Sequence, residues 1–112
     1  SASDAQSWSL VSESVEGTKR YIELDSIKKE GAYRRAWIKT NYVRSSPAGM
    51  DSDRSLFEYD CREERYRILT MTAFSGAHLT GRIVSSGPGR SQWTYAAPGT
   101  SGASILRTVC NY

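Results

Sequence analysis

Polar and apolar residues alternate through two neighbouring stretches in the middle of the chain, residues 55–61 and 65–74. In the first stretch Phe57, Tyr59 and Cys61 fall on one face, because successive side chains of a β-strand point to opposite sides of the sheet. A short polar connection separates the two stretches. The pattern predicts a central β-hairpin with Cys61 on the inward, aromatic face.

The sequence before this hairpin predicts three further strands, at residues 8–14, 19–24 and 32–43. A turn at residues 16–18 joins the first two, and its glycine supplies the left-handed backbone conformation that tight turns need. In the second strand, the alternating set that contains Ile22 is the better candidate for the core. The third strand carries an aromatic residue and a cation on each of its faces.

The segments that connect these strands are polar. Residues 25–27 predict a single helical or 3₁₀ turn, capped by Asp25 or Ser26. Residues 28–31 predict a solvated turn. Residues 45–53 lack periodicity and are rich in turn formers, so we expect an exposed and mobile loop there.

After the central hairpin, two short β-prone pieces lie at residues 82–84 and 92–95. A turn at residues 85–89 separates them, and we expect the two pieces to pair as a small edge hairpin. An unpaired strand edge is the usual route to a homodimer in a small sheet protein. Residues 82–84 or 8–11 offer such an edge, and we expect a monomer–dimer equilibrium.

The last segment, residues 103–109, has the apolar spacing of a short helix, with Thr100 or Ser101 as its N-cap. One side of this helix is covered by Ile105, Leu106 and Val109. Such a face is what packing onto a single sheet requires. The expected fold class is therefore α+β: an antiparallel β-sheet meander of five to seven strands with a C-terminal α-helix packed on it.

The chain has two cysteines, Cys61 and Cys110. A structural zinc site usually needs four Cys or His ligands, so a disulfide is the simpler interpretation. It would tie the helix to the sheet and stabilise the fold by roughly 4 kcal/mol in the chain-entropy model. A disulfide implies an oxidising compartment, which in a bacterium is the periplasm, the cell surface or the medium. The alternative is a pair of buried thiols in a cytosolic protein.

A chain of 112 residues, 38% hydrophobic and 24% charged, is long enough for one modest core. We expect a single domain at residues 8–112 and a disordered N-terminal tail at residues 1–7. The tail is small and polar, which is typical of a mature terminus left after a signal peptide is removed. No stretch approaches the ~20 apolar residues that a transmembrane helix needs.

The sequence offers no catalytic constellation. Its only imidazole, His78, lies in a turn rich in Gly, Ala and Thr, outside any motif that would hold a nucleophile against a base. The acidic loop that contains Asp51 and Asp53 lacks the glycine and the closing glutamate of a calcium loop. Residues 87–90 are too short for a phosphate-binding loop. We therefore predict no catalytic residue, no metal and no cofactor.

Arginines interleaved with aromatic residues are typical of sheets that stack nucleic-acid bases. Here Arg35, Lys39, Arg65 and Arg67 are expected on neighbouring strands beside aromatic residues. A net charge of only +3, the absence of an RNA-binding signature and the expected oxidising compartment argue against this function. We expect a solvated sheet face whose long side chains cover aromatic rings, with no nucleic-acid partner.

Several segments, in their order and spacing, resemble the bacterial surface-adhesin protein E family. They are residues 8–11, 21–27, 35–37, 59–61, 65–69, 93, 98–100 and 105–110. The resemblance covers nearly the whole chain. It implies an antiparallel sheet with a C-terminal helix tied back by a Cys61–Cys110 disulfide. It also implies export, and binding of host matrix proteins such as laminin and vitronectin at a cell surface.

Two functional hypotheses follow. In the first, the chain is a non-enzymatic protein-binding module, and an exposed basic surface contacts acidic segments of a protein or glycan partner. The residues expected in this surface are Lys28, Lys29, Arg34, Arg35 and Lys39. Electrostatic attraction of this kind should weaken as salt is added. In the second hypothesis, the chain is a periplasmic structural or accessory protein that binds no matrix protein.

Overall fold

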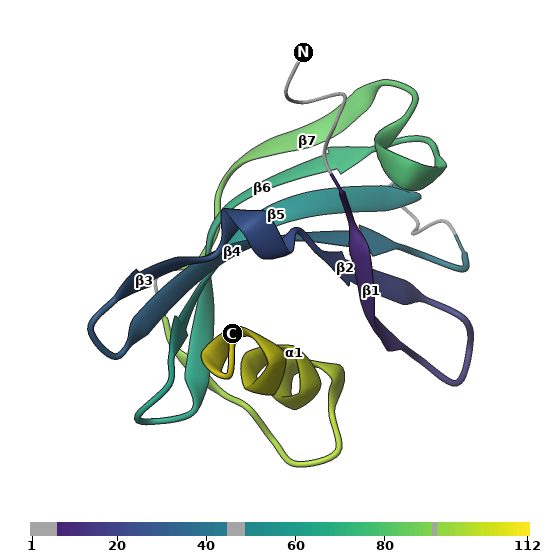
Figure 1. Cartoon of the computed structure of the whole chain (residues 1–112). Coiled ribbons are helices and arrows are strands. Elements are labelled where there is room, and N and C mark those ends of the chain that lie inside the picture. The colour runs from purple at the N-terminus through teal and green to yellow at the C-terminus, as the bar shows by residue number, and fades with distance from the viewer. Residues whose placement is uncertain (1–6, 45–48, 91) are drawn as a thin grey trace.

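The computed structural model describes residues 7–44, 49–90 and 92–112 of the chain. Within these ranges, eight strands form one antiparallel sheet and a single α-helix follows it (Figure 1). The strands are β1 (Ser9–Glu13), β2 (Lys19–Ile22), β3 (Lys28–Glu30), β4 (Tyr33–Asn41), β5 (Ser52–Asp60), β6 (Arg65–Phe74), β7 (Ile83–Pro88) and β8 (Thr94–Tyr95). The 3₁₀ helices are η2 (Leu24–Ser26) and η3 (Ala77–Leu79), and the α-helix is α1 (Ser101–Cys110).

The strand order is β1-β2-β4-β5-β6-β7, with β3 beside β4 and β8 beside β6. The predicted α+β class is confirmed, with eight strands where the sequence predicted five to seven. The strand pieces at residues 8–11 and 82–84 belong to β1 and β7, which stand at the two ends of this order. No helix in the described part of the chain combines the length and the apolarity needed to cross a membrane.

The central hairpin is β5–β6, as predicted, and it is joined through residues 61–64. A β-bulge between Leu56 and Phe57 shifts the register of β6, so that Ile68 pairs with Phe57 but Thr70 pairs with Leu56. A bulge adds one residue to one strand and reverses which faces its later side chains occupy. The helix-facing side of β6 therefore changes from the even-numbered residues before the bulge to the odd-numbered ones after it.

The core lies between α1 and one face of the sheet (Figure 1). The helix buries one apolar side, as its spacing predicted. Its three buried residues, and the sheet residues that they pack against, are Ile105, Leu106, Val109, Ile22, Ala36, Ile38 and Tyr59. Thr100 caps the helix, because its hydroxyl accepts a hydrogen bond from the main-chain N–H of Ala103 at 3.3 Å.

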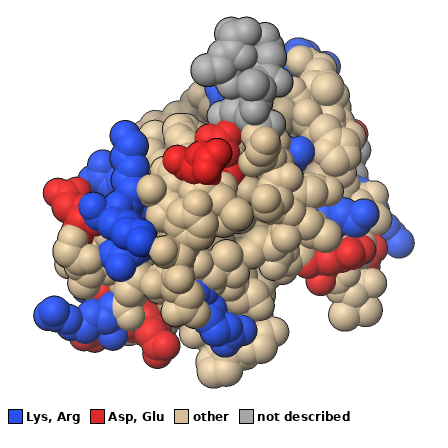
Figure 2. Space-filling model, viewed as in Figure 1, with Lys and Arg blue, Asp and Glu red and all other residues tan. Residues whose placement is uncertain are grey.

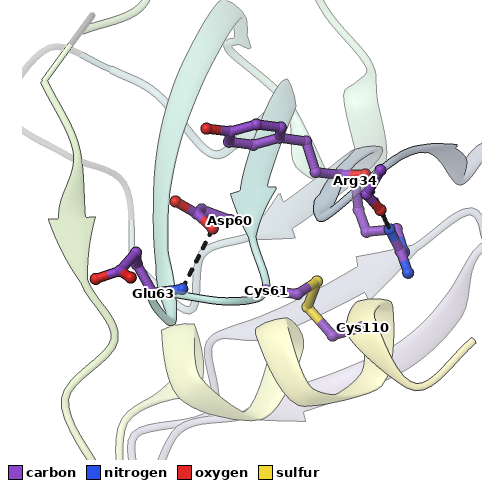
Figure 3. The surroundings of a disulfide bond; sticks show 7 residues. Arg34, Asp60, Cys61, Glu63 and Cys110 are labelled. Carbon is purple, nitrogen blue, oxygen red and sulfur yellow. Dashed lines mark hydrogen bonds between the residues drawn. A yellow bond between two sulfur atoms is a disulfide. The ribbon is translucent and has the colours of Figure 1, made fainter.

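The predicted disulfide is present. Cys61 follows the last residue of β5, Cys110 ends α1, and their Cα atoms lie 5.8 Å apart (Figure 3). The bond closes a sequence separation of 49 residues. It therefore fixes the C-terminal end of the helix to the end of the central hairpin.

Two expectations for the segment between β2 and β4 are wrong. Strand β2 ends at Ile22, and no side chain caps the following turn; instead the Ser26 hydroxyl donates to the main-chain oxygen of Glu23. Residues 28–30 form strand β3 where a solvated turn was predicted. The turn is confined to the residues around Gly31, which adopts φ 62°, and this tight reversal lets β3 pair with β4.

The expected hairpin between residues 82–84 and 92–95 is also wrong. Strand β7 continues through residues 85–88, where a turn was predicted, and it pairs with β6. Strand β8 pairs with the other end of β6. Because β6 is ten residues long, it has room for both partners along one edge. Pro88 is tolerated because β7 is an edge strand. Its missing N–H can face solvent there, so no hydrogen bond between strands is lost.

The prediction of an exposed loop at residues 45–53 is wrong at its end, because Ser52 and Asp53 are buried in β5. Residues 45–48 lie outside the described residues. The same holds for residues 1–6 of the predicted N-terminal tail.

Removing the disulfide should destabilise the protein by about 4 kcal/mol, because the open chain gains the entropy that the closed loop loses. The variant for this test is Cys61→Ser with Cys110→Ser, which leaves no unpaired thiol. Urea unfolding of the oxidised protein and of this double variant measures the difference. Equal midpoints would show that the helix is held by apolar packing alone.

Replacing Thr100 with Ala should lower the free energy of unfolding by about 1 kcal/mol, because the N–H of Ala103 loses its side-chain acceptor. Thr100→Ser keeps a hydroxyl at the same place and serves as the matched control. Urea unfolding with the disulfide intact compares the two variants. If the Thr100→Ala and Thr100→Ser proteins were equally stable, the hydroxyl cap would make no measurable contribution to stability.

Candidate interaction surface

Four of the five predicted basic residues come together where β3 pairs with β4. Lys28 lies opposite Arg35 and Lys29 lies opposite Arg34. All four line one open cleft of about 200 Å³, together with Tyr33. Figure 2 shows Lys and Arg side chains gathered on the side of the molecule where β3 lies. We refer to these five residues as the β3–β4 cleft.

The cations of this cleft differ in how firmly they are held. The Lys29 ammonium donates to the main-chain oxygen of Tyr112 at 2.7 Å and lies 5.9 Å from the centre of its ring. Arg34 folds back onto its own hairpin and donates to the main-chain oxygens of Gly31 and Tyr33 (Figure 3). Lys28 is exposed, so its charge is the one most open to an incoming partner.

Lys39, the fifth predicted residue, does not line the cleft. It is only 8% exposed, and its ammonium lies 4.4 Å from the centre of the Tyr21 ring and 5.5 Å from that of Trp8. Its other neighbour is Nδ1 of His78, at 3.4 Å. Burial lowers the pKa of Lys39. The side chain thus covers aromatic rings, as the sequence suggested for part of this sheet face.

An aromatic and arginine cluster continues from Tyr33 and Arg35 across the sheet face that points away from α1. The Trp93 ring stacks on Tyr33 with centroids 6.0 Å apart. The guanidinium carbons of Arg65 and Arg67 lie 4.7 Å and 4.4 Å from the centre of the Trp93 ring. Sequence reasoning gave Trp93 no functional role, because only the pairing of β8 with β6 brings it here. We refer to these four residues as the Trp93 cluster.

Two buried carboxylates hold the arginines in place. Glu58 pairs with Arg35 at 3.2 Å and with Arg67 at 2.7 Å. Asp60 pairs with Arg65 at 2.9 Å. Both carboxylates are nearly inaccessible, whereas the side chains of the three arginines remain 26% to 49% exposed. The face presented to solvent therefore carries more cations than anions, with Glu30 as an exposed carboxylate at its edge, and much of its positive charge is balanced from beneath.

The pKa of Asp60 is lowered. Burial by itself would raise this pKa, but a hydrogen bond from the Arg65 side chain and another from the main-chain N–H of Glu63 outweigh it. Figure 3 shows the hydrogen bond from Glu63. Each of these donors favours the ionised carboxylate. Asp60 is thus a fixed negative charge that orients the Arg65 guanidinium toward Trp93.

His78 lies in the exposed helix η3, where its main-chain N–H donates to the Asn41 side chain. Its ring faces Lys39, whose ammonium lies 3.4 Å from Nδ1, and the Tyr21 ring, whose centre lies 6.2 Å away. Among the described residues, no group of three or more His, Cys, Asp or Glu side chains is arranged to hold a metal ion.

The family model of surface-adhesin protein E matches residues 8–111 of the chain. Crystal form II of Haemophilus influenzae protein E shares 14% sequence identity, with a TM-score of 0.68 over 93% of this chain and 87% of that one. A second structure of Haemophilus influenzae protein E shares 12% identity, with the same TM-score over 93% of this chain and 83% of that one. These likenesses show a shared fold. No curated protein sequence matches the chain.

Replacing Asp60 with Asn should lower the free energy of unfolding near neutral pH, because Arg65 loses its charged partner. A carboxyl whose folded-state pKa is depressed stabilises the fold while it is ionised, and this contribution disappears as the pH falls. The difference between the two proteins should therefore shrink below about pH 4. Urea unfolding at neutral and acidic pH measures it. A difference that did not change with pH would contradict the assigned role of Asp60.

Proposed function

Because the chain belongs to the surface-adhesin protein E family, we propose that it is a non-enzymatic protein-binding module that attaches to host matrix proteins such as laminin or vitronectin. The family match makes the chain an adhesin-like surface protein. Its placement in the bacterial envelope, in the periplasm or at the outer surface, belongs to the proposal. So does the choice of matrix protein.

The β3–β4 cleft and the Trp93 cluster are the proposed binding surface, and the observation that carries this assignment is their continuity through Tyr33. Tyr33 lines the cleft and also stacks on Trp93. Arginine, tyrosine and tryptophan are the residues that most often dominate the energy of protein interfaces. An aromatic centre flanked by cations suits an acidic segment of a partner protein that also carries an apolar side chain.

The arrangement of charge supports binding rather than mere solubility. Glu58 and Asp60 hold three guanidinium groups in fixed positions, so little side-chain entropy is lost when a partner arrives. Lys28 stands at the outer rim of the surface and is exposed. A rim charge of this kind mainly steers association and makes it sensitive to salt.

A second function is favoured by the same ion pairs. Because Glu58 and Asp60 already balance much of the charge of Arg35, Arg65 and Arg67, this face can also serve as a self-contained structural surface. In that case the chain is a periplasmic structural or accessory protein without a matrix partner. The two functions differ in whether binding survives at physiological ionic strength.

The oxidised protein should bind immobilised laminin or vitronectin saturably at physiological ionic strength, and more tightly at low ionic strength. Lys28→Glu should weaken this binding by about tenfold, because the reversed charge repels an acidic partner. Arg82→Glu makes the same change of charge at the opposite end of the sheet and should bind like the unsubstituted protein. Surface plasmon resonance measures all three affinities.

Binding that appeared only at low ionic strength would favour the accessory function. Equal affinities for the Lys28→Glu and Arg82→Glu proteins would remove the β3–β4 cleft from the binding surface. Thermal unfolding of both variants shows whether each is folded, since both residues are exposed and neither change should disturb the core.

A further inference from the structure

A separate cavity lies on the other side of the sheet, beneath the first turn of α1. Its volume is about 200 Å³, and its walls include Phe57, Tyr66, Ile68 and Ile105. An engineered apolar cavity of about 150 Å³ takes up a benzene molecule. This cavity therefore has room for an apolar group of that size. Its sheet residues alternate with those of the Trp93 cluster, so the two sites face opposite ways.

Arg20 brings a positive charge to the wall of this cavity. It lies opposite Thr40 in the pairing of β2 with β4, which places it on the helix-facing side of the sheet. Its guanidinium makes no hydrogen bond or ion pair with another described residue. A half-buried guanidinium with five donors and no acceptor is an open position for an anion.

The carboxylate that Arg20 influences is Asp53. Burial raises the pKa of Asp53, and the hydrogen bond from Tyr42 and the charge of Arg20 partly offset this effect. The Tyr42 hydroxyl already donates to Asp53 Oδ2, so that oxygen has its partner without Arg20. Arg20 therefore acts on Asp53 through its charge and not through a hydrogen bond. Its N–H donors remain available to a ligand.

The first turn of α1 also borders the cavity, through Ser101 and Gly102. A side chain at Gly102 would meet the Tyr66 hydroxyl, because an added Cβ would lie 2.8 Å from that oxygen. The turn therefore passes close to Tyr66, and main-chain N–H groups at the start of a helix carry partial positive charge. This adds to the effect of Arg20, which is the charged group of the site.

We propose that this cavity binds a small amphipathic carboxylate, whose apolar ring or short acyl chain contacts Phe57, Ile68 and Ile105 and whose carboxylate pairs with Arg20. The planar guanidinium matches a carboxylate through two parallel hydrogen bonds. The apolar walls shield part of the body of the ligand from water. This site lies on the opposite face from the Trp93 cluster and does not depend on matrix binding.

The first test titrates the oxidised, isotope-labelled protein with hexanoate and follows its amide NMR signals. Saturable shifts should be confined to residues around the cavity. Hexan-1-ol, which has the same chain without the charge, should bind about tenfold more weakly. Hexylammonium should give no saturable shifts there. Equal affinity for hexanoate and hexan-1-ol, or hexanoate shifts spread over the surface, would overturn the proposal.

The second test uses variants with matched charge. Arg20→Gln should weaken hexanoate binding by about tenfold. Lys19→Gln removes a charge from the neighbouring residue, whose side chain faces away from the helix, and should leave the affinity unchanged. Ile68→Phe fills the cavity and should abolish binding while Arg20 stays in place. The NMR spectrum shows whether each variant is folded. Arg20→Gln and Lys19→Gln proteins with equal affinity would contradict the assignment.

Discussion

The packing of α1 against one face of the sheet is the interaction on which the rest of the structure depends. Ile105, Leu106 and Val109 supply the helix side of this contact. The largest fully buried sheet residues beneath them are Tyr59, Ile22 and Ile38. The single helix covers one face only, so the opposite face is left to carry charged and aromatic side chains. Cys110 fixes the end of the helix at Cys61, where the central hairpin turns. A small sheet of this kind gains much of its stability from such a cross-link, because its core is modest.

The sequence predicted those parts of the fold that are determined locally. Alternation along residues 55–61 and 65–74 is sufficient to recognise the central hairpin, and the spacing of Ile105, Leu106 and Val109 is sufficient for the helix. The partners of β7 and β8 were missed, because a short strand pairs with whichever edge is free, and that edge belongs to a distant part of the chain. Strand β3 was missed because Lys28–Glu30 contains no apolar residue and pairs only as an extension of the turn at Gly31.

The sequence likewise predicted the part of the proposed binding surface that depends on local pairing, and missed the part that depends on distant strands. Four of its cations lie in two adjacent segments, so that one tight turn is enough to bring them together. Lys39 lies on the same strand as Arg35, but alternation along a strand does not reveal what covers its face, and Trp8 and Tyr21 cover Lys39. Trp93 reaches Tyr33 only through the pairing of β8 with β6. A fold can be shared at 14% identity while the side chains on its open face differ, so the partner has to be sought from this surface itself.

The most direct test of the proposed adhesive surface is hydrogen–deuterium exchange of the oxidised protein, alone and with bound vitronectin. The account predicts slower exchange in β3, in the turn at Gly31, in the first half of β4 and around Trp93. It predicts no change in α1 or in β7. Protection centred on α1 or on β7, with the β3–β4 cleft exchanging as in the free protein, would contradict the assignment of this surface.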